Sequence, residues 1–561
     1  MKQKMIQTKV MKKIAHINIT ASKLVIGFLC LAFPILSNAQ VSTNVPIIFE
    51  IPPDVSPTNV FVQFFNTSGV IKGTYLDNTG TEHSLNITSS YSMAELTSPI
   101  AIKDSVPSNT PAVLISLFES GRVYVNYGQH GLYRGKAPYQ PAAHVNTDTN
   151  YTFRYQYFEP TVVGAQMNAD LSYIDFISIP MSMEAINAPH ASNNPQNTTA
   201  SGIDIINAAA LTSTIPSNNV LPNASAMLPN ENFARVISPQ LAGGLFHGWE
   251  HYLQTTLQGK TTHIKGIYVG TGPQPTTNIY EQAQNYDFLV TFDAEGNALL
   301  TAQPGSGNGF SAGIPPVQQG TGVGDTGQNV FIPFPSLNSD VGIYGNNPSY
   351  TITNNNTFVR TTLGIENDFF GRMVGDLLAG LSFGYPGSTV QFNGTNIEDL
   401  TSTEWWGGRI DDGTTINLTN TPAGQSMFFD KVQTNSLNYH TYAASLDEKT
   451  TGYGFALQDR LDNNLIAFNT QTDMGSYLKI TINSDNSQTN SSPILYISTS
   501  ANAAILDWSS SFNDYILKST PLLSPTSVWV DVVDTPVTIG DKLVVTNAIS
   551  TDKKYFKLSQ E

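Results

Sequence analysis

Two runs of alternating side chains within residues 151–183 constrain the fold more than any other part of the sequence. One face of the first run carries Tyr151, Phe153, Tyr155, Tyr157 and Glu159. One face of the second run carries Leu171, Tyr173, Asp175, Ile177 and Ile179. A period of two is typical of β-strands, and the short connection, which contains Gly164 and Asn168, predicts an antiparallel hairpin.

Each run carries one acid, Glu159 or Asp175, on an otherwise aromatic or aliphatic face. A carboxylate among apolar neighbours needs a partner or a function, because burying it unpaired is costly. If the turn lies near residues 164–166, a strand rise of about 3.3 Å per residue would place the α-carbons of Glu159 and Asp175 roughly 10–13 Å apart. Side chains that lean together would then suit the carboxyl separation of about 6.5–9.5 Å in inverting glycosidases. The alternative is structural, with one acid in a salt bridge and the other at a strand end.

The segments YFEPT, at 157–161, and LSYIDFISIPMSM, at 171–183, resemble the catalytic region of glycoside hydrolase family 64, the thaumatin-like endo-β-1,3-glucanases. The resemblance implies that Glu159 is the general acid and Asp175 the general base of an inverting hydrolysis that needs no cofactor and no metal. The chemistry of the two residues alone would leave these roles interchangeable. Thr161 matches a threonine that the family carries after the acid, whereas Val163 stands at a position that is usually polar.

The expected substrate contacts come partly from the strand faces and partly from the resemblance. Tyr157 and Tyr173 are the aromatic neighbours of the two acids, and Thr161 follows Glu159 on the same face. Trp405 and Trp406 would face opposite ways on a strand, so one could stack on a sugar ring. Packing inside the protein is an equally good explanation for that pair.

A later segment also resembles the family, which shows Tyr-(Gly/Ala)-Phe followed by two aspartates. Tyr453, Gly454, Phe455 and Asp459 match this pattern, and Asp459 is therefore a further expected substrate contact. Gln458 replaces the first aspartate, which weakens whatever that acid does in the family.

Residues 1–39 have the features of a secretory signal peptide. Six lysines precede or flank the apolar run LVIGFLCLAFPIL, and Ser37-Asn38-Ala39 forms a small-x-small cleavage site. We therefore expect a secreted protein, extracellular, periplasmic or at the cell surface, cleaved near Ala39. No other stretch is long and apolar enough to span a membrane. Cys30, the only cysteine, lies in this segment, so the mature chain would hold no disulfide.

The charge balance excludes some classes of partner. Six of the 27 basic residues lie in the leader, so its removal changes the formal net charge from −16 to −22. A surface this acidic would repel nucleic acid and anionic lipid. A neutral polysaccharide such as β-1,3-glucan carries no such penalty, and we expect a monomer that binds it.

The 561 residues are too many for one ordinary core, so more than one domain is expected. Short β-type runs separated by turn residues predict a mainly β protein. We expect a thaumatin-like β-sandwich or barrel over about 41–185 and a mixed α/β subdomain over about 186–485 that forms a wide cleft with it. Residues 40–485 would form the catalytic region. Residues 486–561 would form a small C-terminal β-sandwich-like module.

Two further motifs suggest other chemistry. His247-Gly248-Trp249-Glu250-His251 fits the inverted zincin pattern H-x-x-E-H on an expected helix, but no third zinc ligand accompanies it. A helix that packs in the core is the simpler explanation. Gly309-Phe310-Ser311-Ala312-Gly313 fits the nucleophile elbow G-x-S-x-G, but Pro315 and Pro316 exclude the helix that must follow.

Three functions remain open at this point. The first is a secreted endo-β-1,3-glucanase that uses Glu159 and Asp175. The second is a non-catalytic β-glucan-binding protein on a thaumatin-like scaffold, which the departures at Val163 and Gln458 favour. The third is a cell-surface adhesion protein whose C-terminal module matters most.

Overall fold

The computed structural model describes residues 44–560 apart from 134–139, 223–232, 271–282, 304–327, 355–356, 364–367, 410–414, 420–425, 448, 462–464, 486–494, 501–502, 510–514, 522–528, 540–541 and 549–553. The predicted signal peptide lies outside the described residues. The chain divides into two compact units, Met1–Ser487 and Gln488–Glu561. The protein is mainly β, as the sequence predicted. Among the described residues, none of the helices has the length and apolarity needed to cross a membrane.

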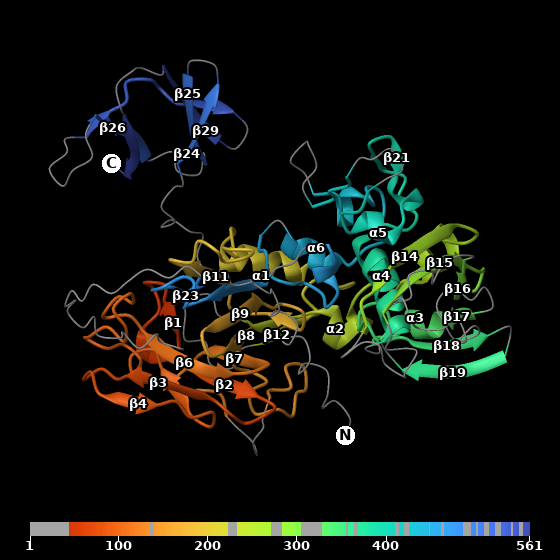
Figure 1. Cartoon of the computed structure of the whole chain (residues 1–561), viewed down its shortest axis with the longest axis horizontal. Coiled ribbons are helices and arrows are strands. Elements are labelled where there is room, and N and C mark those ends of the chain that lie inside the picture. The colour runs from red at the N-terminus through yellow and green to blue at the C-terminus, as the bar shows by residue number, and fades with distance from the viewer. Residues whose placement is uncertain are drawn as a thin grey trace, which may run out of the picture. The chain divides into compact units, whose positions relative to one another are not determined.

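The first unit begins with a twelve-stranded sheet whose main path runs β11-β23-β1-β6-β8-β7-β2-β5 (Figure 1). These strands are β1 Val45–Glu50, β2 Val60–Asn66, β5 Ser90–Ser92, β6 Ala112–Phe118, β7 Gly121–Tyr127, β8 Arg154–Val163, β11 Met181–Ile186 and β23 Tyr477–Ile482. Off the path lie β3 Lys72–Leu76, β4 Glu82–Ser84, β9 Gln166–Leu171 and β22 Ile466–Asn469. Because β1 pairs in parallel with β23, the end of the unit completes the sheet. The sheet is therefore not confined to residues 41–185, the range expected from the sequence.

An antiparallel hairpin forms here, but its second strand is β9, Gln166–Leu171, and not the predicted run Leu171–Ile179. β8 and β9 pair in antiparallel register from Phe158↔Leu171 to Val163↔Gln166. The turn is Gly164-Ala165, and Gly164 takes a φ of 60° that favours glycine. Asn168 lies within β9 and not in the connection. The chain leaves the sheet after Leu171, so the single strand predicted to reach Ile179 is wrong. Asp175 instead lies in a bend before β10, Phe176–Ile177.

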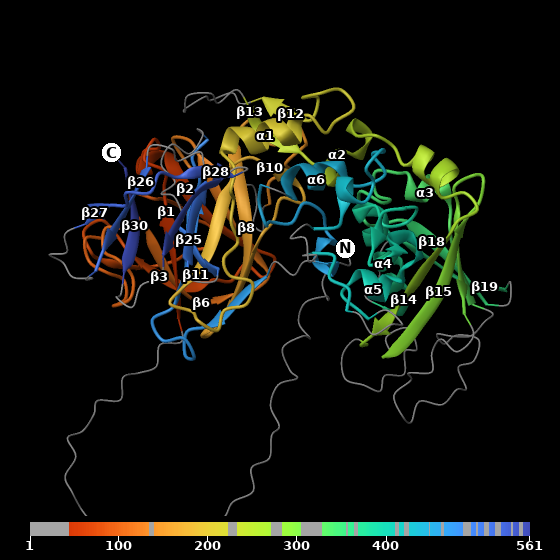
Figure 2. The same ribbon diagram turned by 90° about the horizontal axis from the view of Figure 1, so that it is seen from above.

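A six-stranded antiparallel sheet with the order β14-β15-β16-β17-β18-β19 is the second large sheet of this unit. Its strands are Thr261–Tyr268, Gln284–Phe292, Ala298–Ala302, Gln328–Ile332, Ser349–Asn354 and Thr357–Leu363. Helix α4, Phe369–Phe383, is buried along almost its whole length and packs on one face of the sheet, with Phe369 against Tyr286 and Phe288 (Figure 2). Asp368 caps its start, and Gly384, with a φ of 87°, ends it.

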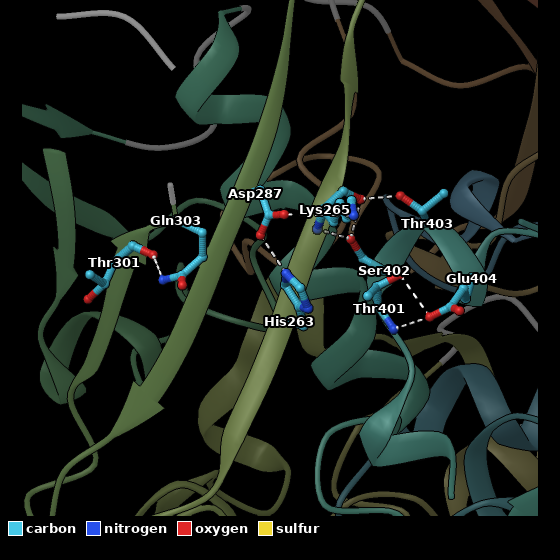
Figure 3. Close-up of polar contacts among 9 residues, drawn as sticks. All are labelled: His263, Lys265, Asp287, Thr301, Gln303, Thr401, Ser402, Thr403 and Glu404. Atoms are coloured by element: carbon cyan, nitrogen blue, oxygen red, sulfur yellow. Dashed lines mark hydrogen bonds and ion pairs between the residues drawn. The ribbon is translucent and has the colours of Figure 1, made fainter. Parts of the chain in front are cut away.

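Polar contacts attach the start of α5, Ser402–Trp405, to the edge strand β14 (Figure 3). The Ser402 hydroxyl accepts from the Lys265 backbone N–H and donates to its carbonyl, which also accepts from the Thr403 hydroxyl. Across β14 and β15, His263 Nε2 lies 2.5 Å from Asp287 Oδ1, and Lys265 Nζ lies 3.8 Å from Asp287 Oδ2. Burial raises the pKa of Asp287, but its hydrogen bonds and electrostatic interactions with His263 and Lys265 outweigh burial and lower the pKa overall. The contacts of Ser402 and Thr403 with Lys265 cover the free edge of β14, whose backbone groups would otherwise be exposed.

Smaller elements connect the two large sheets. Two small sheets consist of β10, β13 Phe233–Ile237 and β12 Val220–Pro222, and of β20 Gln391–Phe392 and β21 Thr395–Asn396. The remaining α-helices of the described residues are α1 Gly202–Ala210, α2 Pro239–Ala242, α3 Phe334–Leu337 and α6 Thr441–Asp447. Short 3-10 turns lie at Pro57–Asn59, Gly243–Leu245, Ile397–Asp399, Phe429–Lys431 and Gln458–Arg460, and a π-helical turn at Tyr252–Thr256.

The second unit has two small antiparallel sheets of its own. One has the order β24-β25-β29-β28, with bounds Tyr496–Ser500, Ala503–Ser509, Lys542–Ala548 and Val537–Ile539. The other has the order β27-β26-β30, with bounds Val530–Asp531, Tyr515–Thr520 and Tyr555–Gln560. Its buried core contains Leu506, Trp508, Leu517 and Val545. Among the aromatic residues described in this unit, Trp508 is thus the one whose side chain is fully buried.

A buried ion pair joins β8 to the last described residues of the first unit. Both terminal nitrogens of Arg154, a fully buried side chain, donate to the Asp485 carboxylate at 2.5 and 2.6 Å. Asp485→Ala would leave this guanidinium without its carboxylate, and we expect it to lower the free energy of unfolding by about 3–5 kcal/mol. Urea unfolding of the full chain measures this loss. Glu295→Ala, at an exposed turn, should stay within about 0.5 kcal/mol of the parent, and an equal effect of both changes would contradict the assignment.

Candidate active site

The alternation of β7 and β8 places a cation beside the first of the two acids. The two strands are antiparallel with Val123 opposite Phe158, so the next position brings Arg122 opposite Glu159. Arg122 Nε donates to Glu159 Oε1 at 2.9 Å. On its other side, Glu159 has Asp170 of β9 as its direct cross-strand neighbour. Glu159 therefore sits between a cation on one neighbouring strand and an acid on the other.

The same guanidinium also holds the second acid. Arg122 Nη1 donates to Asp175 Oδ2 at 3.1 Å, and the Tyr157 hydroxyl donates to the same oxygen at 2.9 Å. The side chains of Arg122, Glu159 and Asp175 are 23%, 33% and 20% exposed, so all three reach solvent. The two carboxylates are thus brought together through one arginine, although their backbones lie on different elements.

The bend that carries Asp175 is fixed by contacts from distant parts of the chain. The Tyr173 N–H donates to the Tyr453 carbonyl at 2.8 Å, and the Tyr442 hydroxyl donates to the Tyr173 carbonyl at 3.0 Å. Ser238, the N-cap of α2, donates its hydroxyl to the Ile174 carbonyl, and its N–H donates to the Asp175 carbonyl. These partners form hydrogen bonds with the backbone N–H and carbonyl groups of residues that leave the sheet. Buried backbone groups need such partners.

Electrostatics keep the bridging arginine charged and its tyrosine neighbour neutral. Burial alone would lower the pKa of Arg122, but Tyr157, Tyr124 and the two carboxylates raise it far above its ordinary value. The guanidinium carbon lies 4.1 Å from the centre of the Tyr157 ring, a cation–π contact. Burial, together with the charge of Asp175, raises the pKa of the Tyr157 hydroxyl well above its usual range. Tyr157 therefore remains a hydrogen-bond donor to Asp175.

The structure separates the predicted substrate contacts into buried and accessible ones. Tyr173 and Trp405 are fully buried, so neither side chain reaches a surface-bound substrate. Tyr157 is also buried and acts on Asp175 instead. Thr161 is partly exposed on the face of Glu159, where its hydroxyl accepts from the Ser120 N–H. The side chain of Asp459 lies outside the described residues.

Two departures from the family pattern and the tryptophan pair have structural explanations. Gln458 is buried, and its side-chain oxygen accepts from the Gly454 N–H at 2.7 Å, so it stabilises the turn of the Tyr453–Phe455 segment. Val163 is partly exposed at the end of β8. Trp405 and Trp406 lie on a helical turn and not on a strand, and Trp405 packs against Gly380 of α4. Their predicted arrangement on a strand is therefore wrong.

The zincin-like motif does not form a shared helical face. His247 lies in a loop, where its Nε2 donates to the Leu437 carbonyl at 2.6 Å, whereas His251 precedes the π-helical turn. The helix predicted through both histidines is therefore wrong. Within the described ranges, no cluster of histidine, cysteine, aspartate and glutamate side chains could hold a metal ion. The G-x-S-x-G segment around Ser311 lies outside the described residues.

Sequence reasoning missed Arg122, although one signal pointed to it. The residue opens an alternating strand, GRVYVNYG, in a chain with few basic residues. Its partners are 37 and 53 residues away along the chain. Arg122 shares its strand face with Tyr124, but only the strand pairing identifies which acids it meets.

Comparisons with known proteins support the resemblance over part of the chain. A search of curated proteins found no match. Solved structures gave weak overall alignments. A laminaripentaose-producing β-1,3-glucanase in complex with laminaritetraose aligns at 12% identity over 80% of this chain and 100% of its own, with a TM-score of 0.41. A β-1,3-glucanase domain from Clostridium beijerinckii aligns at 11% identity over 78% and 98%, with a TM-score of 0.41.

The family model of glycoside hydrolase family 64, described as β-1,3-glucanase, matches residues 56–261. This range contains β7, β8, β9 and the bend before β10, and so includes Arg122, Glu159 and Asp175. The resemblance to glycoside hydrolase family 64 is therefore confirmed for the part of the chain that carries the candidate active site.

Proposed function

We propose that this protein is an endo-β-1,3-glucanase that hydrolyses the glycosidic bond with inversion at the acid pair Glu159 and Asp175. The observation that carries the proposal is the pair itself, two partly exposed carboxylates held by one guanidinium. The family match over residues 56–261 supports β-1,3-glucan as the substrate class. The acidic net charge is compatible with a neutral polysaccharide.

In the proposed reaction, Glu159 donates a proton to the glycosidic oxygen as the bond to the anomeric carbon breaks. A water molecule attacks that carbon from the opposite face, and Asp175 accepts the proton that the water loses. The hydrogen bond from Tyr157 orients the Asp175 carboxylate for this role. Glu159 must carry a proton to act as the acid, whereas the ion pair with Arg122 stabilises its charged form. Substrate binding is therefore proposed to open this ion pair.

Incubation of the purified full-length protein with laminarin tests the proposal. We expect reducing ends to be released from laminarin and from curdlan, and none from cellulose, whose linkages are β-1,4. Proton NMR during the first minutes should show the α-anomer of the new reducing end, because inversion converts the β-linkage.

Two outcomes would contradict the proposal in different ways. Early release of the β-anomer would contradict inversion while leaving β-1,3-glucan hydrolysis in place. Binding to insoluble β-1,3-glucan with no release of reducing ends would favour the non-catalytic glucan-binding alternative.

A further inference from the structure

A second concave site lies apart from the acid pair. It is a pocket of about 530 Å³ between the segment that follows α1, the loop before α6, and α6 itself. Neither Glu159 nor Asp175 lines it. Pockets that bind small ligands typically measure about 300–1,000 Å³, so this one is large enough for one or two sugar rings.

Most hydroxyl groups that line the pocket already donate their protons to the protein. Thr212, Ser213 and Thr214 donate to the carbonyls of Ala209, Ile215 and Leu245, and Ser445 donates to that of Tyr442. Each hydroxyl oxygen keeps lone pairs that can still accept a hydrogen bond. The polar part of the pocket is therefore rich in acceptors, and its ligand should be rich in donors.

The charges around the pocket argue against an anionic ligand. Asp430 is the carboxylate in the lining; it pairs with Lys431 Nζ at 3.4 Å, but no lysine or arginine lines the pocket itself. His247 donates from Nε2 to the Leu437 carbonyl, its Nδ1 lies 3.4 Å from the Tyr344 hydroxyl, and burial lowers its pKa, so it adds no positive charge to the pocket. A phosphate or carboxylate ligand would meet acceptors and a negative charge, whereas sugar hydroxyls would supply the missing donors.

The rim of the pocket is apolar. Leu211 and Leu437 are 66% and 56% exposed, and the ring of Tyr439 forms part of the wall. Large apolar side chains beside an aromatic ring suit the C–H faces of a pyranose, while the hydroxyls below meet its O–H groups. Exposed leucines in the lining, beside several hydroxyl groups, are thus accounted for by a ligand with both kinds of surface.

The hydroxyl of Thr441 is a further indication of a ligand in the pocket. It lines the pocket, and its buried hydroxyl has no hydrogen-bond partner within the part of the chain that the structure describes. Buried polar atoms are nearly always satisfied, so an orphan beside a cavity points to a missing partner. A ligand hydroxyl would supply it after a small rotation of the threonine side chain.

The walls of the pocket also belong to the elements that hold Asp175. Tyr442 of α6, next to Thr441, donates to the Tyr173 carbonyl in the Asp175 bend. The Leu245 carbonyl, which accepts from Thr214, follows α2, whose N-cap Ser238 contacts the same bend. The pocket and the acid pair thus share their supporting elements.

We propose that this pocket binds a neutral saccharide, namely the terminal one or two glucosyl units of a β-1,3-glucan chain or of a released oligosaccharide. The choice of glucan rests on the proposed function, whereas the acceptor-rich, anion-excluding chemistry of the pocket does not. A pocket of about 530 Å³ has room for one or two sugar rings, which suits a short or terminal segment better than a long stretch of polysaccharide.

Calorimetric titration of the full-length Glu159→Gln protein with laminaribiose tests the assignment without turnover. Thr441→Val keeps the shape of the side chain but removes the hydroxyl, and Ala444→Trp fills the pocket. In the Glu159→Gln background we expect Ala444→Trp to abolish the pocket's binding and Thr441→Val to weaken it at least tenfold. Thr291→Val, on an exposed strand position outside the pocket, is the matched control and should leave the affinity unchanged.

Thermal unfolding separates binding from folding. Thr441→Val should match or exceed the parent's melting temperature, because it removes an unsatisfied hydroxyl, and weakened binding then cannot be ascribed to a damaged fold. In the otherwise unchanged enzyme, Ala444→Trp should raise KM for laminarin if the pocket holds the substrate end. It should instead relieve inhibition by laminaribiose if the pocket holds the product.

Unchanged laminaribiose affinity in both pocket variants would overturn the assignment, even if the parent protein cleaves laminarin. Conversely, a protein that binds laminaribiose in this pocket but releases no reducing ends from any β-1,3-glucan would contradict the proposed function and leave the pocket assignment supported. The two failures are therefore distinguishable.

Discussion

Glu159→Gln and Asp175→Asn are each expected to lower kcat on laminarin by about 10²–10⁴-fold, the usual contribution of a positioned general acid or base. Both changes keep the size of the side chain and remove its ability to exchange a proton. In Glu159→Gln the side-chain oxygen can still accept a hydrogen bond from Arg122. In Asp175→Asn it can still accept one from Tyr157, so the fold should persist. Initial rates of reducing-end release, with circular dichroism of each variant, measure the effect.

Asp170→Asn is the matched control for these two changes. Asp170 lies directly opposite Glu159 across the β8–β9 pair, so it is an acid in the same strand environment. We expect it to keep activity within a few-fold of the parent. Loss of activity in Asp170→Asn together with full activity in Asp175→Asn would transfer the second role from the bend to the hairpin.

The first strand and the turn of the hairpin could be predicted because their information is local. A period of two along β8 and Gly164 at the turn indicate them, whereas β9 occupies residues predicted to form the connection. The acids could be singled out for the same reason, as charged positions on apolar faces. The position of Asp175 could not be predicted, because its bend depends on Tyr442, Tyr453 and Ser238.

The alternation of side chains along the sequence also did not reveal which aromatic residues are buried. Tyr173 and Trp405 looked suited to a sugar surface, yet both are covered by elements distant in sequence. Tyr173 is enclosed where Tyr453 passes beside it, and Trp405 where α5 meets α4. The parallel pairing of β1 with β23 is equally non-local, which is why the expected limit near residue 185 did not coincide with the edge of the sheet.

Arg122→Met is expected to lower kcat on laminarin at least tenfold and to destabilise the fold at neutral pH by about 1–3 kcal/mol. It removes the cation between two carboxylates while retaining an apolar side chain of similar length. The stability loss is smaller than for a wholly buried pair because the three side chains are partly exposed. Lys265→Met removes the same charge from an exposed position and should cost less than about 1 kcal/mol. Urea unfolding and laminarin kinetics of both variants make the comparison.

The pH dependence identifies the cause of the Arg122→Met effect. Arg122 stays charged at every accessible pH, so its contribution to stability is present where the carboxylates are ionised. The ion pairs need charged carboxylates, so the stability difference from the parent should shrink on acidification.

Arg122→Lys tests whether charge alone is sufficient. Nε and Nη1 of the arginine contact different carboxylates, whereas a single ammonium is a compact donor that cannot reproduce this fork. We expect Arg122→Lys to recover most of the stability lost in Arg122→Met but only part of the activity, since one of the two acids loses its fixed position. A lysine variant with the parent's kcat and pH–rate profile would contradict the bridging role and reduce Arg122 to a source of positive charge.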